Sequence, residues 1–259
     1  MTLNASAAMI KGSVKDTEGR PVAGVVVTDG LNTVKTDAKG RFRMDADDDS
    51  RFVYISTPSG YVSATLEGKT LFYKEISEDI RKYDFIVRKN EKDDTSHNLI
   101  VIADPQISER SELPELQKHA DDITAFVGQY DKDYTFGLCL GDIVGWDHSI
   151  YPEYNRIMNG SGFEYRYVIG NHDMTNYGRS FETSMKNYED MYGPCWYSFN
   201  VGNVHYIVLN NNFYVGRDYF YIGYIDERQL RWLENDLSYV PEGSRVIVSM
   251  HIPTTMDKS

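Results

Sequence analysis

The second half of the chain alternates apolar segments with amphipathic segments, and this alternation restricts the possible folds more than any other feature of the sequence. Five apolar segments predict strands, at residues 99–103, 135–140, 165–169, 204–209 and 245–250. Two amphipathic segments predict helices, at residues 114–127 and 227–237. In the second, Asp226 is expected to cap the helix, and Leu230, Leu233 and Leu237 are expected to form its apolar stripe. Strands that alternate with helices form an α/β domain, in which helices cover the faces of a sheet.

The first half has a different rhythm, with short β-branched runs separated by turn-forming residues. Six strands are predicted there, at residues 10–14, 25–28, 33–36, 41–44, 52–56 and 82–87. Regular short strands without helical periodicity predict a β-sandwich. The charged run 88–96 contains no apolar residue, which is typical of a solvated linker. We therefore predict a boundary near Lys92, with a β-sandwich domain at 1–91 and an α/β domain at 92–259.

The turn residues of the first half form a recognisable pattern. Gly12 is followed by Gly-x-Pro-x-x-Gly-Val at 19–25 and by Thr-Asp-x-x-Gly-x-Phe at 36–42. This pattern resembles the carboxypeptidase-regulatory-like (transthyretin-like) Greek-key β-sandwiches of exported bacterial proteins. The resemblance implies an accessory or scaffolding module rather than a catalytic one.

Polar residues directly follow four of the five predicted strands of the second half. They are Asp104-Pro-Gln106, Gly141-Asp142, Gly170-Asn171-His172-Asp173 and His251. Ligands bind at the carboxyl ends of strands in open α/β sheets, because the loops that follow the strands converge there. Residues far apart in sequence are therefore expected to meet at one site.

A two-metal centre explains the chemistry of these residues. Such a centre needs a bridging oxygen ligand and further ligands for each ion, with the ions roughly 3.5–4 Å apart. Asp142 is the natural bridge, Asp104 and Gln106 can reach one ion, and Asn171 and His251 can serve the other. Water held between two cations becomes hydroxide near neutral pH and can attack phosphorus in line.

The order of these motifs resembles the calcineurin-like metallophosphoesterases, from about residue 98 to the end of the chain. A typical stretch of that family also matches residues 223–233. The resemblance implies a metal-dependent phosphoric ester hydrolase, which cleaves a phosphomonoester or a phosphodiester by attack of a metal-bridging hydroxide. It implies two divalent ions, of Mn, Fe, Zn or Mg. It also implies that His172 is not a ligand but a catalytic residue that protonates the leaving-group oxygen or stabilises phosphoryl charge.

The sequence departs from the family pattern at three places. Gln106 replaces the usual imidazole, so its ion should be held more loosely and favour Mn²⁺ or Mg²⁺ over Zn²⁺; alternatively, Gln106 only hydrogen-bonds within its loop. The closing Gly-His-x-His is absent, which predicts a C-terminally truncated, partial domain, with a genuine short form as the alternative. Gly145 replaces an acid that orients the catalytic histidine, and Asp147 or Asp173 is a possible substitute.

Two further polar residues are possible substrate contacts. His148 lies in the loop after Asp142, and Asn210 follows a strand on the same rim of the sheet. The alternatives are a solvated loop histidine for His148 and an ordinary turn residue for Asn210.

Composition narrows the partners and the location. A net charge of −12 without a Lys/Arg run argues against polymeric nucleic acid and anionic lipid, and leaves a small phosphorylated substrate. No apolar run approaches the ~20 residues of a membrane span. The leader-like start, residues 1–8, and the sandwich resemblance favour a periplasmic or secreted protein, with the cytoplasm as the alternative. The rival function is a decayed phosphoesterase that binds a glycan or a partner protein.

Overall fold

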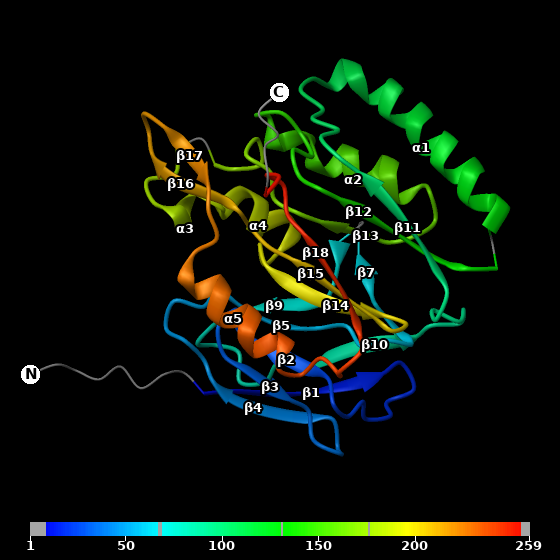
Figure 1. The fold of residues 1–259 in the computed structure, drawn as a ribbon, viewed down its shortest axis with the longest axis vertical. Helices are drawn as coiled ribbons and strands as arrows, with labels where there is room; N and C mark the ends of the chain where they lie inside the picture. The colour runs from blue at the N-terminus through cyan, green and yellow to red at the C-terminus, as the bar shows by residue number, and fades with distance from the viewer. Residues whose placement is uncertain (1–8, 67–68, 131, 176, 255–259) are drawn as a thin grey trace, which may run out of the picture.

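The computed structural model describes residues 9–254 except 67, 68, 131 and 176, so the leader-like start lies outside the described residues. Figure 1 shows β-sheets of the first half (blue to cyan) below an α/β region (green to red). The helices and strands together make a mixed α/β protein. No described helix has the length and apolarity that crossing a membrane requires.

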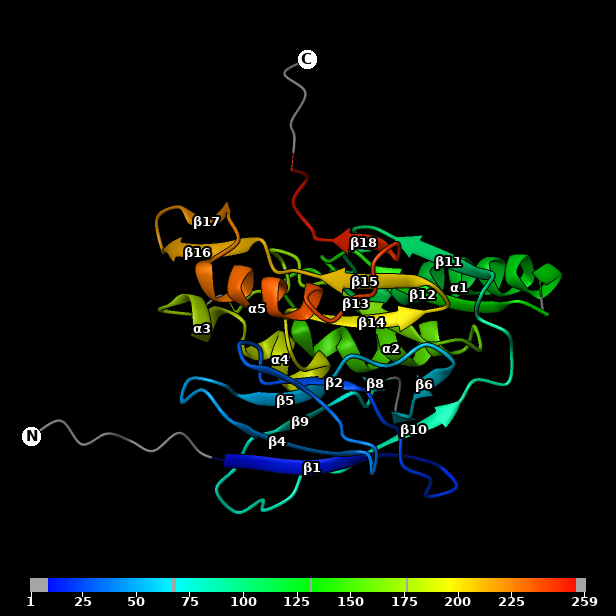
Figure 2. The same ribbon diagram turned by 60° about the horizontal axis from the view of Figure 1, so that its bottom comes forward.

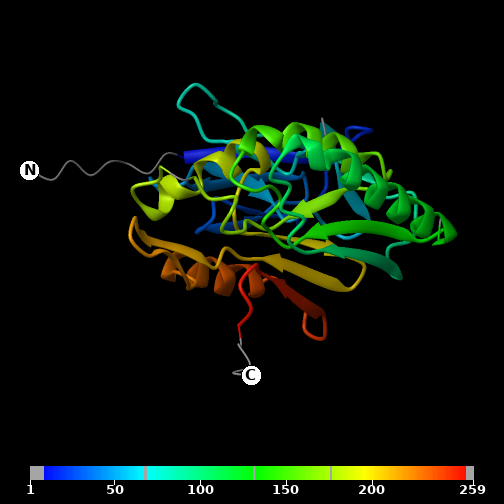
Figure 3. The same ribbon diagram turned by 90° about the horizontal axis from the view of Figure 1, so that it is seen from above.

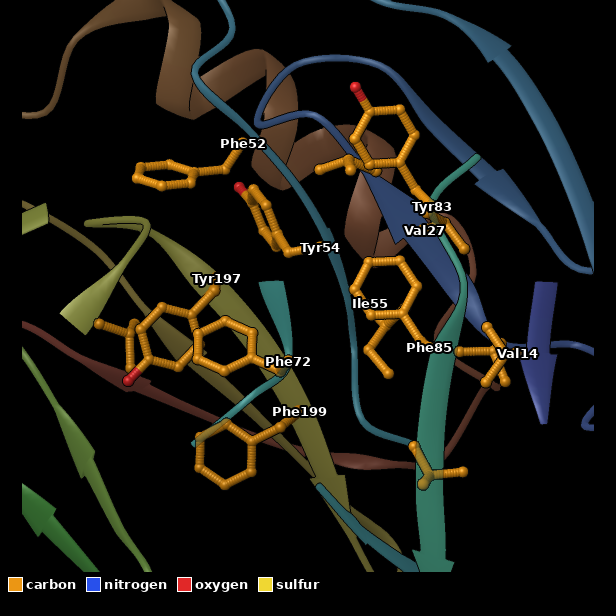
Figure 4. Packing of buried hydrophobic residues seen from close by; sticks show 14 of the residues in the cluster. Val14, Val27, Phe52, Tyr54, Ile55, Phe72, Tyr83, Phe85, Tyr197 and Phe199 are labelled. Atoms are coloured by element: carbon orange, nitrogen blue, oxygen red, sulfur yellow. The ribbon is translucent and has the colours of Figure 1, made fainter. Parts of the chain in front are cut away.

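The first half forms two four-stranded sheets, of order β4-β1-β10-β6 and β3-β2-β5-β9. Their strands are β1 (Met9–Asp16), β2 (Val26–Thr28), β3 (Thr33–Lys35), β4 (Arg41–Asp45), β5 (Phe52–Ile55), β6 (Tyr61–Ser63), β9 (Tyr73–Glu75) and β10 (Phe85–Lys89), and a small pair is formed by β7 (Thr65–Leu66) and β8 (Lys69–Thr70). Side chains of both sheets share one core, including Val14, Val27 and Ile55 (Figure 4). The Greek-key, transthyretin-like arrangement stays a prediction.

The second half contains the five predicted strands, which begin and end within two residues of the expected positions. Strands β11 (His97–Ile102), β12 (Tyr134–Cys139) and β13 (Tyr165–Tyr167) are parallel neighbours, and β15 (Val204–Val208) lies between antiparallel β14 (Tyr197–Val201) and parallel β18 (Arg245–Ser249). Helices α1 (Leu113–Val127) and α2 (Tyr151–Asn159) lie on one side of these strands and α5 (Glu227–Leu237) lies on the other (Figure 3). The candidate ligands follow the carboxyl ends of β11, β12, β13 and β18, and each of these strands has a parallel neighbour.

Several elements were not predicted. In the first half they include β6, β7, β8 and β9. In the second half they include α2, the short helices α3 (Phe181–Ser184) and α4 (Lys186–Tyr192), strand β14, and the hairpin of β16 (Asn212–Gly216) and β17 (Phe220–Gly223). The region is rich in tyrosine, whose helix propensity is poor and whose apolar ring and polar hydroxyl blur a hydrophobic pattern. Many of these rings are nevertheless buried, including Tyr151, Tyr154, Tyr188 and Tyr192.

The predicted apolar stripe of the 227–237 helix is wrong, although Asp226 caps the helix as expected by accepting the backbone N–H groups of Arg228 and Gln229. Leu230 and Leu237 are 45% and 38% exposed. The helix instead buries Gln229, Trp232 and Asp236, because each polar member of this face has a buried partner. A hydrophobicity pattern cannot register such partners.

The charged run after β10 is not a freely solvated linker. Asp94 is buried and accepts the backbone N–H of Gly60 at 2.7 Å, and the Nε2 atom of His97 contacts the Tyr206 hydroxyl at 2.7 Å. The sheets lie in successive layers from β1 and β4, through β2 and β5, to β14 and β15 (Figure 2). Phe199 and Tyr206 belong to the same core as the first-half residues, and Thr57 pairs with Phe199 across the two halves. The two halves thus form one packed unit.

Candidate metal centre

The loops after β11, β12 and β18 bring three candidate ligands together. Ligand atoms of Asp104, Asp142 and His251 all lie within 4.8 Å of one another. The first residue is exposed, the second is buried and the third is half-buried, so the cluster opens to solvent from a buried base. Two carboxylates and an imidazole are a donor set that suits divalent cations of the first transition row.

The orientation of His251 favours a cation at its Nε2 atom. Its Nδ1 atom lies 2.8 Å from the carbonyl oxygen of Leu140, which can only accept, so Nδ1 carries the proton. An imidazole with its proton on Nδ1 alone presents a lone pair at Nε2, and this atom of His251 lies 3.1 Å from Oδ1 of Asn171 and 3.5 Å from Oδ1 of Asp142. Three acceptor atoms this close repel one another unless a cation or a proton lies among them. The hydrogen bond between Nδ1 and the Leu140 carbonyl oxygen is also of the kind that usually orients metal-binding histidines.

Two glycines allow the strand ends to approach this closely. A Cβ atom on Gly170 would lie 2.2 Å from Oδ1 of Asp142, and one on Gly141 would lie 2.7 Å from Nδ1 of His251. Gly141 also has a φ of +96°, where a side chain is strained. The glycines of Gly-Asp and Gly-Asn-His thus make space for the ligands beside them.

The backbone is strained at three of the predicted ligands. Asp104, Gln106 and Asp142 have φ values of +50°, +46° and +50°. Only glycine enters this region without a penalty, which for other residues is about 1–2 kcal/mol. Such strain concentrates at functional sites, where the surrounding structure holds it in place.

The remaining predicted ligands are close to the cluster in different ways. Asn171 reaches it through its Oδ1 contact with His251. Gln106 donates its backbone N–H to the carbonyl oxygen of Asp142 at 2.7 Å, which joins the loops after β11 and β12. Its carboxamide makes no hydrogen bond among the described residues, so its role as a ligand stays a prediction.

His172 lies beside the cluster and is not one of its three members. Its backbone N–H donates to Oδ1 of Asp142 at 2.9 Å. Its Nδ1 atom is buried and has no hydrogen-bond partner in the described part of the chain. The indole of Trp146 lies 4.4 Å from the imidazole, measured between ring centroids. The imidazole is therefore held by ring packing and by its backbone.

Neither proposed substitute acid reaches the His172 ring. Asp173 is fully buried and accepts the N–H groups of Ile143 and Gly170 and the hydroxyl of Tyr151, so it fixes the loop backbone. Burial raises the pKa of its carboxyl to about 6. Asp147 accepts the backbone N–H of Ser149 and caps a short helical turn.

The structure also explains why residue 145 is glycine. A Cβ atom there would lie 2.6 Å from Oγ of Ser108 and 3.0 Å from its Cα. Gly145 donates its backbone N–H to Ile107 at 2.8 Å, and Val144 forms a β-bridge with Ile107. Close contact between two site loops therefore excludes an acidic side chain at this position.

The two expected substrate contacts have other positions. Asn210 is 0% exposed, and its side chain contacts Met185 and the backbone of Asn212, so its placement in a substrate pocket is wrong. His148 is not a solvated loop residue, because Nε2 lies 2.8 Å from the carbonyl oxygen of His172 and Nδ1 lies 2.8 Å from Nδ2 of Asn187. Burial lowers the pKa of His148, which favours the neutral ring. Both ring nitrogens are engaged, so His148 positions the His172 backbone.

Sequence reasoning missed the residues that fix the site from the neighbouring strand. Asn211 accepts the N–H of Ile252 and donates to its carbonyl oxygen, which anchors the segment after His251. Asn212 donates to the carbonyl oxygen of Ile169, just before the Gly170 loop. The Asn-Asn-Asn run was the available signal, because a strand end followed by amides can satisfy the backbone of adjacent loops.

A sizeable cavity is separate from this centre. It has a volume of about 810 Å³, lies between the first-half sheets and the region of α3 and α4, and contains none of the candidate ligands. Its arginines, Arg51 and Arg228, are each paired with carboxylates. Charge that is already neutralised offers little to a ligand, so we place the functional site at the strand ends.

Comparison with known proteins gives one finding. Residues 8–90 match the family model described as N terminal of Calcineurin-like phosphoesterase. No curated protein matches the chain. The match supports a relation to the metallophosphoesterases, which are hydrolases that typically bind divalent metals, but it covers none of the candidate ligands. The first half, expected to be a general accessory module, thus corresponds to a segment associated with phosphoesterases.

Proposed function

We propose that this protein is a phosphoesterase that depends on two divalent metal ions and hydrolyses a small phosphomonoester or phosphodiester. The observation that carries the proposal is the convergence of Asp104, Asp142 and His251, with their ligand atoms within 4.8 Å. The family match of residues 8–90 supports it independently, because that match involves a different part of the chain.

Each residue has a defined part in this proposal. Asp142, with Asp104 and Gln106 on one side and Asn171 and His251 on the other, would hold the ions. The ions would neutralise phosphoryl charge and supply a nucleophile from water at neutral pH. His172 donates a proton to the leaving-group oxygen, and the contact between its backbone and Asp142 couples its position to the ligand set.

We also propose a location and partners for the protein. A periplasmic or secreted location, a small phosphorylated substrate and the absence of a nucleic-acid polymer partner follow from the sequence arguments above. Mn²⁺ or Mg²⁺ is the preferred ion if the Gln106 carboxamide is a ligand, because a carboxamide oxygen is a harder donor than imidazole.

The test compares the full-length protein with Asp142→Asn in the presence of Mn²⁺, using p-nitrophenyl phosphate and bis(p-nitrophenyl) phosphate. We expect kcat/KM to fall by at least about 100-fold, since even residues behind the ligands change activity by 10–100-fold. Asp122→Asn on the exposed face of α1 is the matched control and should retain activity. Equal rates for wild type and Asp142→Asn on both esters would refute the catalytic assignment.

Elemental analysis separates the rival binding function. The enzyme proposal expects close to two ions per wild-type chain and fewer in Asp142→Asn. A decayed protein that binds a glycan or a partner would contain substoichiometric metal and hydrolyse neither ester.

A further inference from the structure

An exposed tryptophan lies directly beside the proposed proton donor. The rings of Trp146 and His172 are 4.4 Å apart at an interplanar angle of 38°. Phe220 of the β16–β17 hairpin lies 5.6 Å from the same indole at 61°. The indole is nevertheless 44% exposed. Core packing does not account for a large aromatic surface that stays open to solvent at a polar site.

The loop that carries Trp146 is held by backbone contacts. Gly145 donates to the carbonyl oxygen of Ile107 at 2.8 Å, and Val144 forms a bridge with the same residue. Ser108, the next residue after Ile107, lies so close to Gly145 that it excludes a Cβ there. The chain therefore has little freedom immediately before the indole.

Phe220 is held in a strained conformation on the opposite side. Its φ is +63°, and it is the single non-glycine residue with positive φ in the described chain that is not a predicted ligand. A bulky residue in this region is a genuine outlier. The Tyr214 ring packs edge-on against Phe220 at 6.0 Å and 87°. The hairpin thus keeps an aromatic ring beside Trp146 where a glycine would relieve strain.

The position of these rings bears on the leaving group. This step rests on the proposed function, in which His172 protonates the leaving-group oxygen, so that the rest of the leaving alcohol must lie next to His172. We propose that Trp146 and Phe220 form a platform that binds a planar ring carried by the leaving alcohol. The substrates are then small phosphoesters of ring-bearing alcohols, and the platform determines specificity.

The surroundings favour a neutral ring over a cationic group. Tryptophan also binds quaternary ammonium groups, but such sites gain from a nearby unpaired carboxylate. Asp147, which follows Trp146, accepts from Ser149 and pairs with Arg110. Asp104 and Asp142 belong to the ligand cluster. These three carboxylates are therefore already committed to other partners or to the ligand cluster.

The test measures binding of non-hydrolysable phosphonates to the Mn²⁺-loaded full-length protein by calorimetry. The probes are 2-phenylethylphosphonate, 2-cyclohexylethylphosphonate, butylphosphonate and 2-(trimethylammonio)ethylphosphonate. We expect the phenyl probe to bind about 3–10-fold more tightly than the cyclohexyl probe. This is the extra affinity that contact between two aromatic rings contributes beyond the burial of their surface area. Trp146→Ala should remove this preference and Trp146→Phe should retain most of it. Tyr130→Ala, at a tyrosine with the same 44% exposure on another part of the surface, should leave it unchanged.

A parallel measurement of kcat/KM uses benzyl, cyclohexylmethyl and propyl phosphate, which all release primary alcohols. Equal values for the benzyl and cyclohexylmethyl esters, equal losses for all esters in Trp146→Ala, or tightest binding of the ammonium probe would each overturn the platform and leave the phosphoesterase proposal standing. Failure of wild type to hydrolyse any of the esters or the p-nitrophenyl substrates would instead overturn the phosphoesterase proposal.

Discussion

The two halves of the molecule differ in which residue types take left-handed backbone conformations. In the described part of the first half, every residue with positive φ is a glycine, as at Gly19, Gly24 and Gly40. In the second half, Asp104, Gln106, Asp142 and Phe220 take such angles with side chains in place. A turn that only reverses the chain can use the residue with the lowest penalty. A turn that must also present a functional group retains the group and the strain.

The largest effect should come from His172, the proposed proton donor in the second half. In His172→Asn, hydrolysis of an alkyl phosphate should fall by about 10²–10⁴-fold, the usual contribution of general acid catalysis. Hydrolysis of p-nitrophenyl phosphate should fall much less, because p-nitrophenolate leaves without protonation. Steady-state kinetics on both esters measures this difference. His119→Asn on the surface of α1 is the control, and equal losses on both esters would contradict the role of His172.

Asp104→Gly tests whether strain and function are opposed at one position. Its activity should fall by at least about 100-fold because a ligand is lost. The free energy of unfolding of the metal-free protein should rise by up to about 1 kcal/mol, because glycine relieves the αL penalty at φ +50°. Denaturant titration in a chelator measures the second effect. Asp104→Asn should lose activity without this gain, and a destabilised Asp104→Gly would break the comparison.

Loss of a contact between the two halves should have an effect of intermediate size, on the free energy of unfolding. Arg51 of the first half donates to Glu189 of α4 at 3.0 Å, and the Glu189 side chain is only 12% exposed. Arg51→Ala should reduce the free energy of unfolding by about 1–3 kcal/mol, since it leaves a mostly buried carboxylate without its partner. Urea titration measures the loss. The double variant Arg51→Ala/Glu189→Gln should recover part of it, and no recovery would show that the ion pair is not the cause.

The same variant has a pH dependence of predictable sign. Burial raises the pKa of Glu189 in the folded state, although Arg51 lowers it. Removal of Arg51 raises this pKa further, so the folded variant binds its proton more tightly than the unfolded chain does, and its stability falls as pH rises through that interval. The loss in Arg51→Ala should therefore be larger near pH ~7 than near pH ~4. A loss independent of pH would contradict the burial of Glu189.

Gly19→Ala should have the smallest effect and the opposite pattern to Asp104→Gly. Gly19 has a φ of +79°, and no atom lies within 4 Å of a Cβ placed there, so only backbone strain is introduced. The free energy of unfolding should fall by about 1 kcal/mol while kcat/KM is unchanged. Thermal unfolding and ester hydrolysis measured on the same preparation check both parts. A change in kcat/KM would show that the first half also determines the geometry of the site.

The sequence predicted those parts of the fold whose signals are local. Apolar runs located the parallel strands within two residues, and the polar residues after them identified Asp104, Asp142 and His251 as neighbours. The tyrosine-rich elements between β13 and β15 escaped prediction, because their stability comes from ring packing between distant segments, as in the Tyr167–Tyr192 contact at 4.3 Å. Long-range packing has no signature in a short window of sequence.

It was harder to predict what each residue does than to predict which residues belong to the site. His148 lies near Asp142 in sequence, and Asn210 follows a strand on the same rim. The side chain of His148 instead contacts the His172 carbonyl oxygen, and that of Asn210 contacts Met185 and the Asn212 backbone. Trp146 gave no signal, because nothing in its local sequence indicates that Phe220, far along the chain, packs beside it. The Gln106 carboxamide and the Greek-key topology remain predictions.

The shared core has a consequence for the order of synthesis. The first-half sheets are complete when Lys89 has left the ribosome, but Phe199 and Tyr206, which belong to the same core, follow more than 100 residues later. At roughly 5–20 residues per second, the nascent first half waits on the order of 5–20 s with apolar side chains uncovered. The newborn chain should therefore depend on chaperones during that interval, and mature protein should accumulate poorly where they are scarce.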